Sequence, residues 1–455
     1  VDCFIPMAST DALNKTLASL QSDDHVNRIV VLQTKAENVA GVDDTLTIDT
    51  LKSSETMRQI AATATAPYTL VYLKEQYMEM GLYALERMLR IAECTGAGMV
   101  YADHYNISAE GVRSEAPVID YQQGSLRDDF DFGSVLLFRT DALKKAAAHM
   151  TQSYQAAGFY DLRLKLSINE RFEHINEFLY SEVELDNRKT GEKLFDYVDP
   201  RNRASQIEME AAATEHLKAI GAYLKPTFKS VDLKAEPFDV EASIMIPVRN
   251  RIRTIRDAIE SALSQKTNFK FNVFIVENGP DYHSTDGTTE LIDEYKNDER
   301  VIHIIPNRRD IGVGNSWNMA AHHPQCGRFI VQLDSDDVYS DEHTLQKFVD
   351  AFYEQQCAMV IGSYMLTDIH KNMLPPGKID HREWTPENGR NNALRINGLG
   401  APRAFFTPIL REVKLPNVNY GEDYALGLAI SRYYQIGRIY DVLYCCRRWD
   451  DNSDA

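Results

Sequence analysis

Three aspartates that follow an apolar run are the residues of this sequence best placed to do chemistry. Residues 329–333 read as a buried strand, and Asp334, Asp336 and Asp337 come directly after it. Neighbouring carboxylates repel one another, so the cluster is unfavourable unless a cation binds there. Oxygen ligands on Asp334 and Asp336 suit Mg²⁺ or Mn²⁺ that carries a bound diphosphate. The alternative is an acidic turn before a helix expected near Asp341, and this stretch alone does not decide between the two.

A second polar strand end lies upstream. Residues 272–277 are predicted as a strand ending in Glu277 and Asn278, and in the turn that follows Asp286 is a candidate N-cap and Gly287 permits a tight bend. Ligands of open α/β sheets usually bind at the carboxyl ends of the strands, so Glu277 and Asn278 can hydrogen-bond a base or a ribose. A plain strand-turn-helix unit explains the turn but not the polar strand end.

A glycine-containing loop separates these two segments. Arg308 and Arg309 precede Gly312 and Gly314, which open a predicted helix. A helix N-terminus beside such a loop is a candidate anion site, and either arginine can stack on or hydrogen-bond a nucleotide base. Glycine-rich loops are common, and surface arginines often have no special role, so this signal is weak on its own.

The elements that must position these residues alternate between strand and helix twice along the chain. Such alternation argues for α/β layers with parallel sheets. A long helix is expected over 78–97, a bridging helix over 206–224, and an irregular pattern beyond Pro375. The predicted strands are 1–6, 28–33, 68–73, 99–101 and 135–138 in the first series, and 243–247, 272–277, 301–305, 329–333 and 359–364 in the second.

Three short matches between the two series occur in the same order. We therefore expect two copies of one fold, the second intact and the first eroded. The matching segments are 3–6 with 243–247, 138–143 with 405–410, and 160–168 with 422–431.

Composition excludes several classes of protein. The 455 residues carry 49 basic and 67 acidic side chains, a net charge of −18, whereas a nucleic-acid-binding protein is usually basic. The six cysteines form no C-x-x-C pair, which fits a reducing compartment. No apolar run approaches the roughly 18 residues of a transmembrane segment, and no secretory signal is recognisable. The chain begins with Val rather than Met, so we expect native residues to precede it.

Taken together and in this order, the motifs of residues 240–455 resemble those of the family 2 glycosyltransferases of GT-A fold. Any one of the motifs is weak, but five in the family's order make the resemblance strong. The five are an opening strand that ends at Pro247, the Glu277-Asn278 pair with the S-x-D-G-T turn at 284–288, the N-x-G stretch at 307–318, the DxD motif at 334–337, and the Glu422-Asp423 pair at a helix start.

The resemblance implies a role for each motif. Asp336 would bind a Mn²⁺ or Mg²⁺ ion that bridges the diphosphate, Asp334 would contact the ribose or the metal, and Asp423 would be the general base. The alternative for Glu422 and Asp423 is a plain helix cap. The implied donor-binding set is Pro247, Arg249, Glu277, Asn278, Arg308, Arg309, Asp334, Ser335 and Asp336, and the weaker acceptor-side candidates are Glu422, Gly400, Arg403, Arg448 and Trp449.

The sequence departs from the family pattern in two regions. Glu277 and Asn278 stand where the family carries two aspartates, and an insertion at 279–283 follows them, so the nucleotide is left open. Trp449 stands near the position where many relatives carry a His ligand. Arg448-Trp449 also matches the end of the Q-x-x-R-W motif of processive relatives, but Cys445 replaces its Gln, and we infer no processive synthase.

The first copy departs much further. Aligning Leu73 with Leu333 places Lys74-Glu75-Gln76 opposite the DxD motif, and an ammonium group there repels a cation. We therefore expect an α/β chain of two tandem GT-A (Rossmann-like, nucleotide-diphospho-sugar transferase) domains with mostly parallel central sheets flanked by helices. The expected parts are a degenerate, non-catalytic domain at 1–185, a helical bridge and linker at 186–239, and a catalytic domain at 240–455.

The expected function is the metal-dependent, inverting transfer of a sugar from a UDP- or GDP-sugar to a hydroxyl of a glycan or a lipid-linked acceptor. Nucleotide-sugars are cytosolic, so we expect a cytoplasmic enzyme, at most peripheral to the inner face of the membrane. One alternative is a non-catalytic scaffold that binds a glycan or a nucleotide-sugar. Another is a sugar nucleotidyltransferase, which would need a glycine-rich basic signature where this chain has residues 247–250. The donor sugar, the linkage and the oligomeric state stay open.

Overall fold

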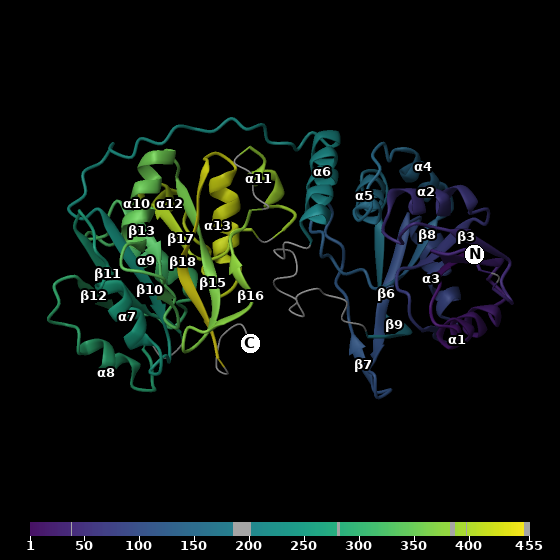
Figure 1. Cartoon of the computed structure of the whole chain (residues 1–455), viewed down its shortest axis with the longest axis horizontal. Coiled ribbons are helices and arrows are strands. Elements are labelled where there is room, and N and C mark those ends of the chain that lie inside the picture. Colours follow the sequence, from purple (N-terminus) through teal and green to yellow (C-terminus); the bar gives the residue numbers. More distant parts are fainter. Residues whose placement is uncertain (38, 185–201, 280–282, 383–386, 397, 450–455) are drawn as a thin grey trace. The chain divides into compact units, whose positions relative to one another are not determined.

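The computed structural model describes residues 1–37, 39–184, 202–279, 283–382, 387–396 and 398–449. They form two compact units (Figure 1). The first unit includes helix α6 (Arg203–Ala219) and ends at Tyr223, and the second unit continues from Leu224. Helix α6 packs against the first unit rather than standing in a separate bridge at 186–239. The expected boundary at 185–186 lies outside the described residues.

The second unit is built on one mixed sheet. Its strand order is β12-β11-β10-β13-β17-β15-β18-β14, with β16 paired to β15. The strands from β12 to β13 are parallel, β17 runs antiparallel to both of its neighbours, and β15 and β18 are again parallel. The strands are β10 (Ala242–Val248), β11 (Phe271–Glu277), β12 (Val301–Ile304), β13 (Phe329–Gln332), β14 (Val338–Tyr339), β15 (Met359–Asp368), β16 (Met373–Ile379), β17 (Arg403–Phe406) and β18 (Ile436–Arg448).

Helices cover this sheet, so its central strands are apolar along their whole length. In β10 the side chains of Ile244, Met245 and Ile246 are all fully buried, as in a strand covered on both faces. Helix α9 packs against β10 and β11 and also contacts α12 and α13, while α7 and α10 contact other strands of the sheet. The helices are α7 (Ile255–Leu263), α8 (Thr288–Asp293), α9 (Val313–His322), α10 (Thr344–Gln355), α11 (Gly389–Asn392), α12 (Thr407–Val413) and α13 (Glu422–Ser431).

The first unit repeats this topology strand for strand. Its sheet order is β3-β2-β1-β4-β8-β6-β9-β5, with β7 on β6, so each strand has a counterpart in the second unit at the same place in the chain order. Its elements are β1 (Asp2–Pro6), α1 (Thr10–Gln21), β2 (Arg28–Gln33), β3 (Asp44–Thr47), α2 (Ser54–Thr63), β4 (Tyr68–Tyr72), β5 (Met78–Met80), α3 (Ala84–Thr95), β6 (Met99–Ile107), β7 (Arg113–Ala116), β8 (Val135–Arg139), α4 (Thr140–Ala148), α5 (Gly158–Ser167) and β9 (Phe172–Val183).

The predicted tandem α/β fold is confirmed, with three corrections of detail. The sheets are mixed rather than mostly parallel, because an antiparallel strand follows the first parallel set. Residues 78–80 form the edge strand β5 instead of the start of a long helix, since they pair with β9. The region beyond Pro375 is regular and contains β17, α12, α13 and β18.

A buried ion pair stands in the first unit at the place of the acidic cluster. Lys74 follows β4 and one further residue, as Asp334 follows β13, and its ammonium group contacts the fully buried Glu182 on β9. His104 Nε2 lies 3.3 Å from the same Glu182 oxygen, and Ser134 donates a hydrogen bond to it at 3.2 Å. The buried carboxylate of Glu182 is therefore partnered by side chains of the same unit.

The counterpart of Asp423 in the first unit is Asp161, by the match of 160–168 to 422–431. Asp161 lies on α5 and is fully buried, and neither carboxylate oxygen has a hydrogen-bond partner within the described part of the chain. The Lys165 Nζ atom is 3.6 Å from Oδ1. Burial raises the pKa of Asp161 to about 6, and the nearby Lys165 opposes that rise.

We expect Asp161→Asn to change how the stability of the first unit depends on pH. A carboxyl group whose pKa is higher in the folded state than its ordinary 3.8 stabilises the fold at low pH and loses that contribution as pH rises through about 6. The free energy of unfolding of the variant should therefore be close to that of wild type at pH 4 and larger by about 2–3 kcal/mol at pH 7. Calorimetric unfolding at both pH values measures this, and an equal effect at the two values would contradict it.

Candidate active site

The acidic cluster forms a turn at the carboxyl end of the parallel strands. Asp334 follows β13 and Leu333, and the Asp337 amide donates to the Asp334 carbonyl at 3.1 Å. Ser335, Asp336 and Asp337 are buried, and Asp334 is partly exposed. The turn, residues 334–337, is called the acid turn below.

Strand β18 holds the acid turn in place. The Tyr444 hydroxyl accepts a hydrogen bond from the Asp334 amide at 2.9 Å. The backbone amide of the buried Arg447 donates to Asp337 Oδ1 at 2.7 Å. The Arg447 side chain donates from Nε to the Asp336 carbonyl, and its Nη1 lies 2.6 Å from an Asp257 carboxylate oxygen on α7. The sequence analysis missed both β18 residues, because they lie 110 positions or more from the residues they hold.

The carboxylates of the acid turn lie close together, and the pKa values of two of them are raised. Burial raises the pKa of Asp337 well above its ordinary value, and repulsion from Asp336 adds to the rise. Burial also raises the pKa of Asp334, although Gln332 Nε2 donates to both of its oxygens at 3.0 and 2.9 Å. Arg251 Nε, 3.7 Å from Asp336 Oδ2, is the nearby cationic group.

The donor atoms of the acid turn suit a hard divalent cation. Asp334 and Asp336 offer carboxylate oxygens, and Mg²⁺ or Mn²⁺ is often held by one or two carboxylates together with substrate phosphates. Over the residues that the structure describes, no three His, Cys, Asp or Glu side chains gather as a metal cage.

Glu277 is buried and hydrogen-bonded within the protein, which its place at a strand end does not predict. It is fully buried; its Oε1 lies 2.9 Å from His303 Nε2, and its Oε2 accepts from the Ser284 amide and the Thr289 hydroxyl. Burial tends to raise the pKa of Glu277, but these hydrogen bonds together hold it below the ordinary value. The side chain thus ties the turn after β11 to β12, and its contact with a nucleotide stays a prediction.

The remaining donor-side candidates lie around this strand end. Pro247 pairs with Val276 in the sheet, and the Arg249 guanidinium packs so closely on Gly279 that no Cβ fits there. Asn278 donates its amide to the Val248 carbonyl. Arg308 and Arg309 are exposed, and Arg308 forms a two-point ion pair with Asp310. Residues 280–282 of the expected insertion lie outside the described part of the chain.

The backbone amides of the glycine loop before α9 donate to a neighbouring loop. The amides of Gly312, Val313 and Gly314 donate to Asn417 Oδ1, Asn419 Oδ1 and the Val418 carbonyl at 2.8, 3.2 and 3.1 Å. These three amides therefore already have partners within the protein, and the candidate anion site at this loop stays a prediction. A Cβ at residue 314 would stand 1.9 Å from the Pro416 carbonyl oxygen, so glycine is needed there for close approach of two loops.

Asp423 lies in the first turn of α13, where it forms an ion pair with Arg403. Gly421 precedes the helix with a φ of +78°, and the helix N-terminus favours a nearby negative charge. Arg403, on β17, is 9% exposed, and its Nη1 contacts Asp423 Oδ2. The charge of Arg403 also favours the ionised form of Asp334, so these three side chains share one electrostatic environment.

The other acceptor-side candidates are less closely grouped. Glu422 is 9% exposed, and burial followed by repulsion from Asp423 raises its pKa. Gly400 packs against the imidazole of the buried His381. At the end of β18, Arg448 precedes Trp449, whose ring lies 4.8 Å from the Arg253 guanidinium carbon.

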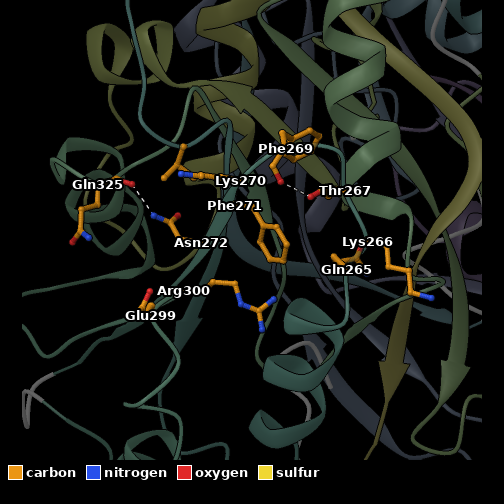
Figure 2. Close-up of a pocket in the computed structure, with 11 residues that line it drawn as sticks. Gln265, Lys266, Thr267, Phe269, Lys270, Phe271, Asn272, Glu299, Arg300 and Gln325 are labelled. Carbon is orange, nitrogen blue, oxygen red and sulfur yellow. Dashed lines mark hydrogen bonds between the residues drawn. The ribbon is translucent and has the colours of Figure 1, made fainter.

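A separate cavity lies at the opposite edge of the sheet (Figure 2). It has a volume of about 620 Å³, and residues before β10, β11 and β12 line it, among them Val240, Lys270 and Arg300. The Arg300 guanidinium lies over the Phe271 ring at 5.4 Å. The cavity is at the amino ends of the parallel strands and does not include any of the predicted site residues.

Comparison with known proteins gives the family of this site. Residues 243–413 match the family model described as glycosyl transferase family 2. The second unit contains a family 2 glycosyltransferase domain. The resemblance predicted for 240–455 is thereby confirmed. The match to the family model includes the acid turn but ends before Asp423.

Named relatives agree with this family. The putative teichuronic acid biosynthesis glycosyltransferase TuaG of Bacillus subtilis is 26% identical over 192 residues, which cover 42% of this chain and 71% of that protein. An uncharacterized glycosyltransferase of Rickettsia felis is 35% identical over 245 residues, 51% of this chain but only 38% of that protein. The crystal structure of residues 1–349 of S. aureus TarS in complex with UDP-GlcNAc is 18% identical, covers 47% of this chain and 60% of that one, and gives a TM-score of 0.38.

No helix within the described residues is both long and apolar enough to cross a bilayer.

Proposed function

We propose that the second unit transfers a sugar from a nucleotide-diphospho-sugar to an acceptor hydroxyl, with inversion at the anomeric carbon. The observation that carries this proposal is Arg403, which pairs with Asp423 at the start of α13 and whose charge favours the ionised form of Asp334 in the acid turn. The acid turn can hold the leaving diphosphate, and Asp423 can take a proton. The match to the family 2 model supports the same assignment.

Each side chain has a defined part in the proposed reaction. Asp334 and Asp336 would hold a Mn²⁺ or Mg²⁺ ion at the donor's diphosphate end, and such an ion would neutralise charge that develops on the leaving group. Asp423 accepts the proton of the attacking hydroxyl, and Arg403, which contacts Asp423 Oδ2, orients that carboxylate. Attack from the face opposite the leaving group makes one displacement, which inverts the configuration.

The substrates are proposed by class. The donor is a UDP- or GDP-sugar, and the acceptor is a glycan or a lipid-linked sugar reached from the cytoplasm, with the protein at most peripheral to the membrane. The name of TuaG places that relative in teichuronic acid biosynthesis, which supports a polysaccharide as product here. We propose that the first unit is non-catalytic, because the ion pair of Lys74 with Glu182 takes the place of the acidic cluster.

Asp336→Ala should abolish donor binding and turnover together. Without this carboxylate the diphosphate loses a cation ligand, and we expect kcat/KM to fall by about 10²-fold or more. A panel of UDP- and GDP-sugars with Mn²⁺ or Mg²⁺ is scored by thermal shift and by release of free nucleotide. Asp341→Ala, which removes an exposed aspartate just beyond β14, is the matched control. No donor response from wild type would refute the proposed function.

Asp423→Asn should separate binding from transfer. The amide cannot accept a proton, so the rate is expected to fall by about 10²–10⁴-fold while the donor-induced thermal shift stays as in wild type. Inversion is checked by proton NMR of the first sugar that wild type releases, which must have the anomeric configuration opposite to that of the donor. A variant with wild-type kcat would exclude Asp423 as the base.

Arg403→Ala should lower kcat more than it raises the KM of the donor. The guanidinium orients Asp423 without standing in for any substrate group, so its loss misplaces the base and costs about 10- to 100-fold in kcat. Arg403→Lys should restore part of the rate, because one point charge remains but the orientation is poorer. An unchanged kcat with a raised donor KM would instead identify Arg403 as a donor ligand.

A further inference from the structure

The S-x-D-G-T turn at residues 284–288 holds the loop that follows β10. The Ser284 hydroxyl accepts a hydrogen bond from the Asn250 amide at 3.0 Å, and the Thr288 hydroxyl accepts one from the Arg251 amide at 2.8 Å. Asn250 has a φ of +50°, a left-handed conformation that asparagine tolerates better than most residues. The backbone of Arg251 is therefore fixed at the carboxyl end of β10.

The side chain of Arg251 extends from this loop to the acid turn. Its Nη1 donates to the Asn250 carbonyl at 3.2 Å, and its Nε lies 3.7 Å from Asp336 Oδ2. A separation of 3.7 Å is an ion pair but is too long for a hydrogen bond, so the guanidinium acts on Asp336 through its charge. The Arg251 side chain is 20% exposed and that of Asp336 is 11% exposed, so solvent reaches both partners. A partly exposed ion pair of this length stabilises the fold little and is easily exchanged.

Positive charge at this place relieves repulsion within the acid turn. Burial is the main cause of the raised pKa values of Asp334 and Asp337, and repulsion from Asp336 adds to both. A cationic group beside Asp336 weakens that repulsion. Arg251 thus supplies, from the protein itself, the kind of charge that a divalent cation would bring to the same carboxylate.

We propose that Arg251 is an exchangeable counter-cation of the acid turn. Before the donor binds, its guanidinium neutralises Asp336. When Asp336 becomes a ligand of a divalent cation, Arg251 leaves it and pairs with the diphosphate of the nucleotide. The planar guanidinium suits this second partner, because its paired N–H groups match two phosphate oxygens. This inference rests on the proposed function and assigns to Arg251 a part in donor binding.

The exchange predicts effects of opposite sign on two binding constants. Mn²⁺ alone has to displace Arg251, so Arg251→Gln should bind Mn²⁺ about two- to fivefold more tightly than wild type. A nucleoside diphosphate gains the guanidinium contact, so in the presence of Mn²⁺ the same variant should bind UDP or GDP about tenfold more weakly. Electron paramagnetic resonance of free Mn²⁺ measures the first constant, and titration calorimetry with UDP and with GDP measures the second.

Two further variants separate local from general effects. Arg256→Gln removes the same charge from an exposed position on α7, where Arg256 pairs with Glu294 at 2.8 Å, and should leave both constants as in wild type. Arg251→Lys keeps the charge but loses the planar fork. It should therefore bind Mn²⁺ alone as wild type does and lose only part of the nucleotide affinity.

The outcomes distinguish this inference from the proposed function. Opposite shifts of the two constants in Arg251→Gln, with neither shift in Arg256→Gln, support the exchange. An affinity for Mn²⁺ alone that is unchanged or lower in Arg251→Gln overturns it, even when wild type turns over a donor normally. Tighter Mn²⁺ binding by Arg251→Gln, with neither UDP nor GDP bound by wild type, would keep Arg251 as the counter-cation of Asp336 and refute the transferase.

Discussion

Burial of the acid turn is the constraint on which the second unit depends. A turn that places three carboxylates beside one another under the surface needs donors or cations around it. Strand β18 supplies the Arg447 amide, which donates to Asp337, and the Arg447 guanidinium, which donates to the Asp336 carbonyl and also contacts Asp257 on α7. The Tyr444 hydroxyl accepts a hydrogen bond from the Asp334 amide. The last strand of the described chain therefore completes a site that begins at the fourth strand of the unit.

The first unit carries different charged residues at the same position of the same sheet topology. There, the ammonium group of Lys74, just beyond β4, pairs with the carboxylate of Glu182 on β9. The fold is thus compatible with either arrangement, since the same strand order carries both. Function in this chain follows from which charges stand at the end of a strand, not from the sheet.

The sequence was sufficient for features that are local. Apolar runs ending in carboxylates identified β13 with its acid turn, and three short matches identified the duplication. Features that depend on distant contacts could not be predicted: nothing near Arg403 indicates that it pairs with Asp423, twenty residues further on, on another element. Strand β5 was missed because three residues rich in Met and Glu have no β signature, and only pairing with β9 makes them a strand.

Distant segments also take up groups that look available in the sequence. The amides of the glycine loop look available in the sequence, but two of them donate hydrogen bonds to the side chains of Asn417 and Asn419, which precede α13. Glu277 stands at a strand end in both sequence and structure, yet His303, Ser284 and Thr289 occupy its two oxygens. In both cases the partner that decides the outcome comes from a separate element.

The hydrogen bonds between residues 310–314 and 416–419 have a dynamic consequence. They join the loop after β12, on the nucleotide side of the proposed site, to the start of the helix that carries Asp423. Any displacement of one segment carries the other with it, because breaking the connection would expose several paired backbone groups at once. We therefore expect these two segments to move together.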